Sequence, residues 1–104
     1  MGYYTGYNLS MVKGDYDLIS QFVEENDDAA YAIDGNGDTR EKCKWYEHED
    51  ALKIFSSKHP DVIFKLEGEG EESGDIWIKY FKNGKCQTCE AKISFDEFDE
   101  NKLL

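Results

Sequence analysis

The dipeptide Asn83-Gly84 constrains the fold more than any other local feature, because it separates two segments of β-forming residues, 76–82 and 85–95. Both residues accept a positive φ, which makes Asn-Gly the preferred pair for a two-residue type I′ hairpin turn. A tight turn of this kind fixes the register of the strands that it joins and places Ile78 opposite Cys89. The sequence therefore predicts an antiparallel hairpin formed by these two segments.

This register sorts the residues of the predicted hairpin between the two faces of a sheet. Ile76, Ile78 and Tyr80 share one face, and Trp77 and Phe81 share the other with several charged residues. We expect the first face to pack on helices and the second to be the open side of a two-layer fold. Exposed aromatic residues are enriched at interface hot spots, so the two aromatics of the second face are predicted to bind a partner or a second copy. Cover by the chain's own loop and stacking on a small ligand are the alternatives.

The rest of the chain alternates strand and helix patterns. Leu18, Ile19, Phe22 and Val23 form one helical stripe, and Pro60 ends a second helix. The predicted elements are, in order, a strand at 3–12, a helix at 16–26, short strands at 29–33 and 42–46, a helix at 47–58, a strand at 62–66 and the hairpin. We therefore expect a single α+β domain over residues 1–104, with an antiparallel sheet and two helices on one face, as in ferredoxin-like folds. Residues 96–104 are predicted to form an acidic, frayed tail.

The charge of the chain limits the partners that it favours. The 104 residues carry 23 Asp and Glu against 12 Lys and Arg, a net charge of −11, while 39% hydrophobic residues argue against disorder. This balance disfavours direct contact with nucleic acid or an anionic membrane and favours a basic partner. No apolar run is long enough to span a membrane, no secretory signal is present, and the cysteines number three, which is odd. We therefore expect a cytoplasmic protein.

Motifs typical of catalysis or metal binding are few. Cys86 and Cys89 form a CxxC pair, which can ligate zinc or do redox chemistry, but positions three apart in a strand point to opposite faces. Buried cysteines are the interpretation that we favour. The segment 34–38 matches the start of a calcium loop but lacks glycine at the sixth position and glutamate at the twelfth. No arrangement typical of an active site is found, so we expect no enzymatic activity and no cofactor.

Two stretches of the sequence carry a resemblance to known proteins. They are Trp45-Tyr46-Glu47-His48-Glu49 and the acidic, glycine-rich segment from Gly68 that continues through the aromatic hairpin strand to Gly84. Together they resemble segments of small phage and mobile-element proteins with ferredoxin-like domains. The size and acidity of the chain are also similar to those of phage-encoded inhibitors of host defence, which include anti-CRISPR and anti-restriction proteins. This resemblance implies a ferredoxin-like fold and an inhibitory role, without assigning a function to any residue.

Charge and resemblance together predict a phage-encoded protein that inhibits a nucleic-acid-handling defence protein of the host, such as a CRISPR effector or a restriction nuclease. Carboxylates on a rigid scaffold can take the place of phosphates in a basic groove, as in DNA mimics. The predicted site combines the acidic residues of one loop with two aromatic anchors: Glu69, Glu71, Glu72, Asp75, Trp77 and Phe81. The alternative is a small protein–protein interaction module, or a homodimer, with no nucleic-acid-related target. A zinc-binding module that uses Cys86 and Cys89 is a third hypothesis.

Overall fold

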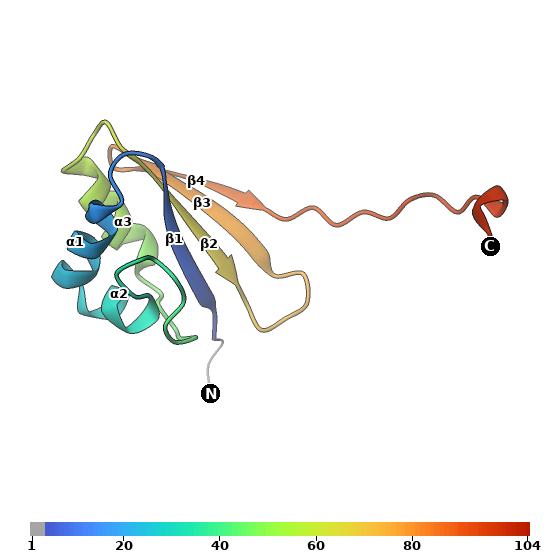
Figure 1. Ribbon diagram of the computed structural model, residues 1–104, viewed down its shortest axis with the longest axis horizontal. Coiled ribbons are helices and arrows are strands. Elements are labelled where there is room, and N and C mark those ends of the chain that lie inside the picture. The colour runs from blue at the N-terminus through green and yellow to red at the C-terminus, as the bar shows by residue number, and fades with distance from the viewer. Residues whose placement is uncertain (1–3) are drawn as a thin grey trace.

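The computed structural model describes residues 4–104 and has two layers, with helices packed on one face of an antiparallel sheet (Figure 1). In chain order, the described elements are β1 (Gly6–Lys13), α1 (Asp17–Glu25), α2 (Asp27–Ala32), α3 (His48–Ser57), β2 (Ile63–Glu69), β3 (Ile76–Lys82), β4 (Lys85–Glu90) and the 3-10 helix η1 (Glu100–Lys102). This arrangement confirms the α+β class and the antiparallel sheet. None of the described helices is long and apolar enough to cross a membrane.

The sheet has the strand order β1-β2-β3-β4, and each neighbouring pair is antiparallel. The predicted hairpin is confirmed, because Asn83 has a φ of 48°, Gly84 has a φ of 77°, and Ile78 lies opposite Cys89. The three α-helices found within residues 4–104 all fall between β1 and β2. This order differs from the β-α-β-β-α-β order of ferredoxin-like folds, in which a second helix joins the third and fourth strands.

The core lies between the helical layer and one face of the sheet. Its largest fully buried apolar side chains are Phe22, Phe64, Phe81, Leu9, Ile19, Ile33, Leu52 and Leu66. Aromatic rings join the two layers, since the ring centroid of Phe55 on α3 lies 5.1 Å from that of Phe22 and 5.7 Å from that of Phe64. Burial of a large apolar side chain contributes about 1.5–3 kcal/mol, so these contacts hold α1 and α3 on the sheet.

Both predicted helices are confirmed almost to the residue, as α1 and α3. The first strand, predicted at 3–12, runs from Gly6 to Lys13, and Tyr3 lies outside the described residues. The strand predicted at 62–66 begins at Ile63 and continues to Glu69 as β2. It is longer than predicted because Gly68 still pairs with Tyr7 of β1 and with Trp77 of β3. The apolar periodicity therefore located the central elements, and the pairing partners extended them.

The predicted strand at 29–33 is wrong, because residues 27–32 form the helix α2. The side chain of Asn26 caps this helix by accepting a hydrogen bond from the amide of Ala29 at 3.0 Å. Alanine is the best helix former, and two aspartates in the first turn interact favourably with the positive end of the helix dipole. Asp27 and Asp28 therefore begin a second helix.

The segment after α2 covers the outer edge of β1. The strand predicted at 42–46 is not formed, and Cys43 makes an isolated bridge to Thr5 through two backbone hydrogen bonds of 3.0 and 3.1 Å. The amide of Leu9 also donates to the carbonyl oxygen of Gly37 at 2.7 Å. Edge strands with unpaired backbone groups attract other chains, and here the loop satisfies part of that edge. Within the described residues, no strand pairs with the outer edge of β4.

Strand β4 ends at Glu90, earlier than the predicted end at residue 95. The chain then runs extended to η1, so residues 91–104, called the C-terminal arm below, project away from the sheet (Figure 1). Every residue of the arm is exposed, including Phe95 at 91% and Phe98 at 79%. The arm is acidic, as predicted, but it also exposes five large apolar side chains: Ile93, Phe95, Phe98, Leu103 and Leu104.

Candidate functional site

The structure reverses the predicted assignment of the two sheet faces. Trp77 and Phe81 point toward the helices, whereas Ile76 and Tyr80 lie on the open face. Phe81 is 0% exposed, so the prediction that it anchors a partner is wrong. The reason lies in the neighbouring strand, because Phe81 is paired with Phe64, and β2 buries its even-numbered residues while its other side is charged after Ile63. Strand β3 alone is ambiguous, since both of its faces carry large apolar residues.

Trp77 is half-buried at the border of the helical layer, and its own chain fixes the indole. The ring lies over Gly68 of β2, where any side chain would overlap it. The imidazole of His48 stacks on the indole with a centroid distance of 5.2 Å and an interplanar angle of 15°. The ammonium of Lys79 lies 4.5 Å from the ring centroid. Cover by the chain itself therefore describes Trp77 better than a free anchor does.

A buried lysine that sequence reasoning did not single out connects β3 with α3. Lys79 is 9% exposed, and its ammonium donates to the Glu49 carboxylate at 2.8 Å and to Nε2 of His48 at 2.7 Å. The other ring nitrogen of His48, Nδ1, lies 2.7 Å from the carbonyl oxygen of Trp45. An ammonium only donates and a carbonyl only accepts, so His48 is neutral and carries its proton on Nδ1.

The electrostatics of this cluster agree with its hydrogen bonds. Burial lowers the pKa of His48, which keeps the imidazole neutral. The hydrogen bond from Lys79 lowers the pKa of Glu49, which keeps the carboxylate charged. Two acceptors and the face of an indole thus replace the water that the buried ammonium loses. The sequence pattern of β3 could have revealed this cluster, because Lys79 alternates with Trp77 and Phe81 and so lies on the same side of the strand.

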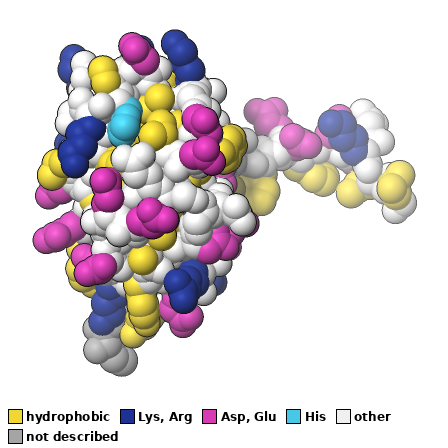
Figure 2. Space-filling view, turned by 60° about the vertical axis from the view of Figure 1, so that its left-hand side comes forward, with side chains coloured by type: hydrophobic (Ala, Val, Ile, Leu, Met, Phe, Trp, Pro, Cys, Tyr) yellow, Lys and Arg dark blue, Asp and Glu magenta, His cyan; other side chains and the backbone are white. Residues whose placement is uncertain are grey.

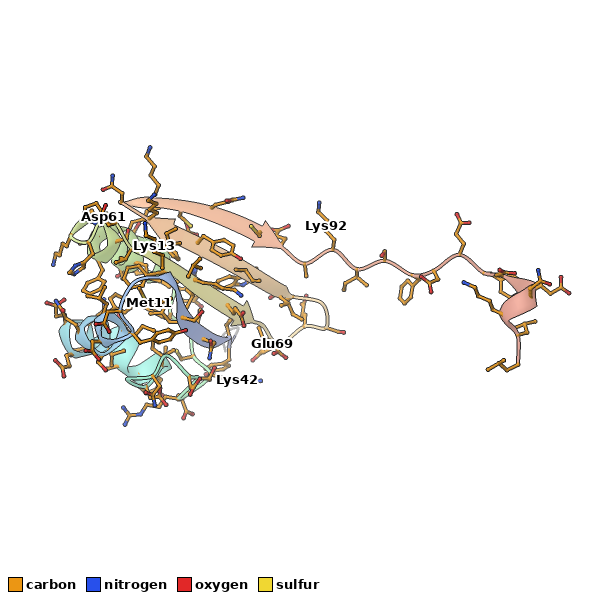
Figure 3. All side chains as sticks on the ribbon, turned by 45° about the horizontal axis from the view of Figure 1, so that its top comes forward. Met11, Lys13, Lys42, Asp61, Glu69 and Lys92 are labelled. Atoms are coloured by element: carbon orange, nitrogen blue, oxygen red, sulfur yellow. The ribbon has the colours of Figure 1, made fainter. Side chains whose placement is uncertain are left out.

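The predicted acidic residues lie at the end of the sheet opposite the Asn-Gly turn. Glu69 ends β2, Glu71 and Glu72 are exposed in the connection to β3, and Asp75 is half-buried. A pocket of about 240 Å³ lies beside this connection, and Lys42 and Glu69 are among its lining residues. Figure 3 shows these two residues at the same end of the sheet. The structure therefore brings the predicted carboxylates together, but it separates them from the aromatic pair, which faces the helices.

Most of the negative charge lies on the helical layer instead. Residues 14–61 hold 13 Asp and Glu against five Lys and Arg, whereas residues 62–92 hold six against five. All of these helical-layer carboxylates are exposed except Asp34 and Glu49. Figure 2, in which the helical side of Figure 1 comes forward, shows acidic side chains spread over this face. The helical layer, rather than the loop after β2, is therefore the main source of negative potential.

Within the described residues, neither the Cys86/Cys89 pair nor the loop at 34–38 forms a metal site. Cys86 and Cys89 lie on opposite faces of β4, as their spacing predicts. Among residues 4–104, no group of three His, Cys, Asp or Glu side chains is placed to hold a metal ion. The Asp34 carboxylate instead accepts hydrogen bonds from the amides of Asn36 at 2.9 Å and Asp38 at 3.1 Å, which stabilises a turn.

Comparison with known proteins identifies no relative: no family model, curated protein sequence or solved structure matches this chain.

Proposed function

We propose that this chain is a non-enzymatic binding protein whose acidic helical face binds the basic surface of a nucleic-acid-handling protein. The observation that carries this proposal is the charge asymmetry of the two layers, with 13 acidic against five basic residues in the segment 14–61. Carboxylates held on packed helices keep fixed spacings, so they can occupy a groove that is built for phosphates.

The acidic residues at the junction of α1 and α2 are central to this face. Glu24, Glu25, Asp27 and Asp28 follow one another closely, and all four are exposed. The loop with Glu71 adds negative charge at the far end of the sheet, as a secondary contribution. A defence nuclease of a phage host, the partner class that the resemblance implies, stays a prediction within this proposal.

A second candidate function is a protein–protein interaction module with no nucleic-acid-related target. It is supported by two large apolar side chains on the helical layer, Tyr31 at 62% and Ile54 at 61% exposure. Such a module would bind through apolar contact, and its affinity would change little with salt. The two candidates therefore differ in a quantity that is simple to measure.

The first experiment is retention of host proteins on the immobilised chain at low and moderate salt, followed by competition with duplex DNA. The proposal expects a retained nucleic-acid-binding protein that is released by either salt or DNA. For that partner, the Glu24→Lys/Asp28→Lys variant should weaken binding by at least about tenfold, since each lost contact of a charged pair is worth on the order of 1 kcal/mol.

The matched control is Glu71→Lys/Glu72→Lys, which reverses charge in the loop after β2. Equal losses from both variants would mean that net charge alone matters and would remove the helical face from the proposal. Binding that ignores salt but is lost in Ile54→Glu would favour the interaction module. Retention of no nucleic-acid-binding protein would overturn the proposed partner class.

A further inference from the structure

The open face of the sheet carries an apolar stripe along its middle. Ile76, Ile78 and Tyr80 of β3 lie on this face. Ile76 is 47% exposed and makes no part of the core under the helices. On β4, Cys89 pairs with Ile78, and the amide of Ala91 donates to the carbonyl oxygen of Ile76 at 3.0 Å. The neighbouring strand β2 is charged on this face, with Glu67 opposite Ile78 and Lys65 opposite Tyr80, so the apolar stripe is bordered by charged residues, as at an interface with a polar rim.

The two ends of the open face differ in charge, although Lys42 lies beside Glu69 at the more acidic end. At the end with the Asn-Gly turn, Lys82 pairs directly with Lys85, and Lys13 pairs with Ile63 in the adjoining strands. At the other end, Glu69 pairs with Ile76, and the exposed Glu71 follows it. Figure 3 shows Lys13 and Glu69 at opposite ends of the sheet. Two lysines directly opposite each other repel, which costs stability unless a negative group lies nearby.

The C-terminal arm continues both properties of this face. Ala91, Ile93 and Phe95 keep the parity of Cys89, so the arm extends the apolar stripe beyond the acidic end of the sheet. The side chain of Ile93, which is 68% exposed, lies beside Gly74 and joins the stripe to the arm. The arm carries four carboxylates against two lysines, and the carboxylates all lie in its outer part, at Asp96, Glu97, Asp99 and Glu100.

We infer that the open face and the C-terminal arm bind a second copy of this chain. In a two-fold dimer with the two open faces together and their strands antiparallel, the lysine end of each copy lies over the acidic end of its partner. The apolar stripes then meet in the middle. Each arm leaves its own acidic end, passes the lysine end of the partner and brings its carboxylates to the partner's lysines.

The size of the face explains why the arm is needed. Four strands at a spacing of about 4.8 Å and seven residues at about 3.3 Å give a footprint of roughly 400 Å². A stable interface buries about 800 Å² on each partner, so the sheet face alone supplies about half of that area. The arm, with Phe95 and Phe98 almost fully exposed, supplies apolar surface for the remainder. In this dimer, both acidic helical faces point outward and stay accessible.

Sedimentation velocity of the full chain over a range of concentrations tests this inference. We expect a species of twice the 12.0 kDa chain mass. Ile78→Glu in the stripe and Phe95→Ser/Phe98→Ser in the arm should each weaken self-association by at least about tenfold, because each removes buried apolar contact. The matched control is Ile54→Glu on the helical layer, which should leave self-association unchanged.

Charge exchange tests the orientation of the dimer. Lys82→Glu/Lys85→Glu should weaken self-association, and adding Glu69→Lys/Glu71→Lys in the same chain should restore it. A chain that stays monomeric at every concentration would overturn the inference. Dimers that ignore the stripe and arm variants, or the absence of rescue by the second charge change, would also overturn it.

The inference stands apart from the proposed function, although both concern binding. The stripe variant Ile78→Glu is expected to be monomeric and still to bind a basic partner through the helical face. A monomeric native chain that binds such a partner would refute the dimer alone. A dimer with no affinity for basic proteins would refute the proposed function alone.

Discussion

The contact between Lys79 and Glu49 offers the sharpest test of how this fold tolerates a lysine in its interior. We consider the double-mutant cycle of Lys79→Met and Glu49→Gln, in which each change removes charge and keeps most of the side-chain volume. The lysine ammonium lies 2.8 Å from the carboxylate, and the two side chains are 11% and 43% exposed. The pair therefore lies between a fully buried and a fully solvated ion pair.

The expected coupling energy follows from this intermediate position. Exposed pairs contribute roughly 0.2–1 kcal/mol, and breaking a fully buried pair costs about 3–5 kcal/mol. Because the carboxylate of Glu49 keeps part of its hydration, we expect a coupling of about 1–2 kcal/mol. The single variant Lys79→Met has a smaller and less informative effect, since it also relieves the desolvation of a buried ammonium.

The assay is urea unfolding monitored by far-UV circular dichroism, at concentrations where the midpoint is independent of protein concentration. The matched control is the ion pair between Lys65 and Glu67 on the open face, with an N–O distance of 3.1 Å and side chains 30% and 47% exposed. This control should show a coupling below about 0.5 kcal/mol. A coupling for Lys79 and Glu49 no larger than that of the control would refute the argument that burial strengthens the inner pair.

Three further predictions concern stability. Burial lowers the pKa of His48 below its ordinary 6.5, so the unfolded chain takes up a proton at a higher pH than the folded chain does. The free energy of unfolding should therefore fall as pH drops below about 6.5. Urea titrations from pH 7.5 to 5 should show this decline, and His48→Gln should reduce it. Gly37→Ala should cost at least about 3 kcal/mol in the same assay, because φ is 87° and the new side chain would overlap the backbone of β1, whereas Gly35→Ala should be tolerated. Phe81→Ala should cost about 3–5 kcal/mol and Ile76→Ala less than about 1.5 kcal/mol. A larger loss from Ile76→Ala than from Phe81→Ala would mean that Ile76, and not Phe81, faces the helices.

The sequence by itself determined the features that depend on neighbouring residues in the chain. The turn at Asn83-Gly84 and the register of its hairpin follow from backbone preferences at two positions, and α1 and α3 follow from a helical apolar stripe. The acidic character of the surface and the opposite directions of Cys86 and Cys89 follow in the same way, from composition and from the period of a strand.

Only the tertiary structure decided which face of the hairpin meets the helices. Both faces of β3 carry large apolar side chains, so the choice depends on β2, which buries Phe64 and Leu66 on one side and is charged after Ile63 on the other. That choice buried Phe81, and it placed Lys79 beneath α3, where Glu49 and His48 satisfy it. It also left Ile76 exposed and Ile78 half-buried on the open face. A sequence records which residues share a side of a strand, whereas the inward side is set by the combined burial of strands and helices far apart in the chain.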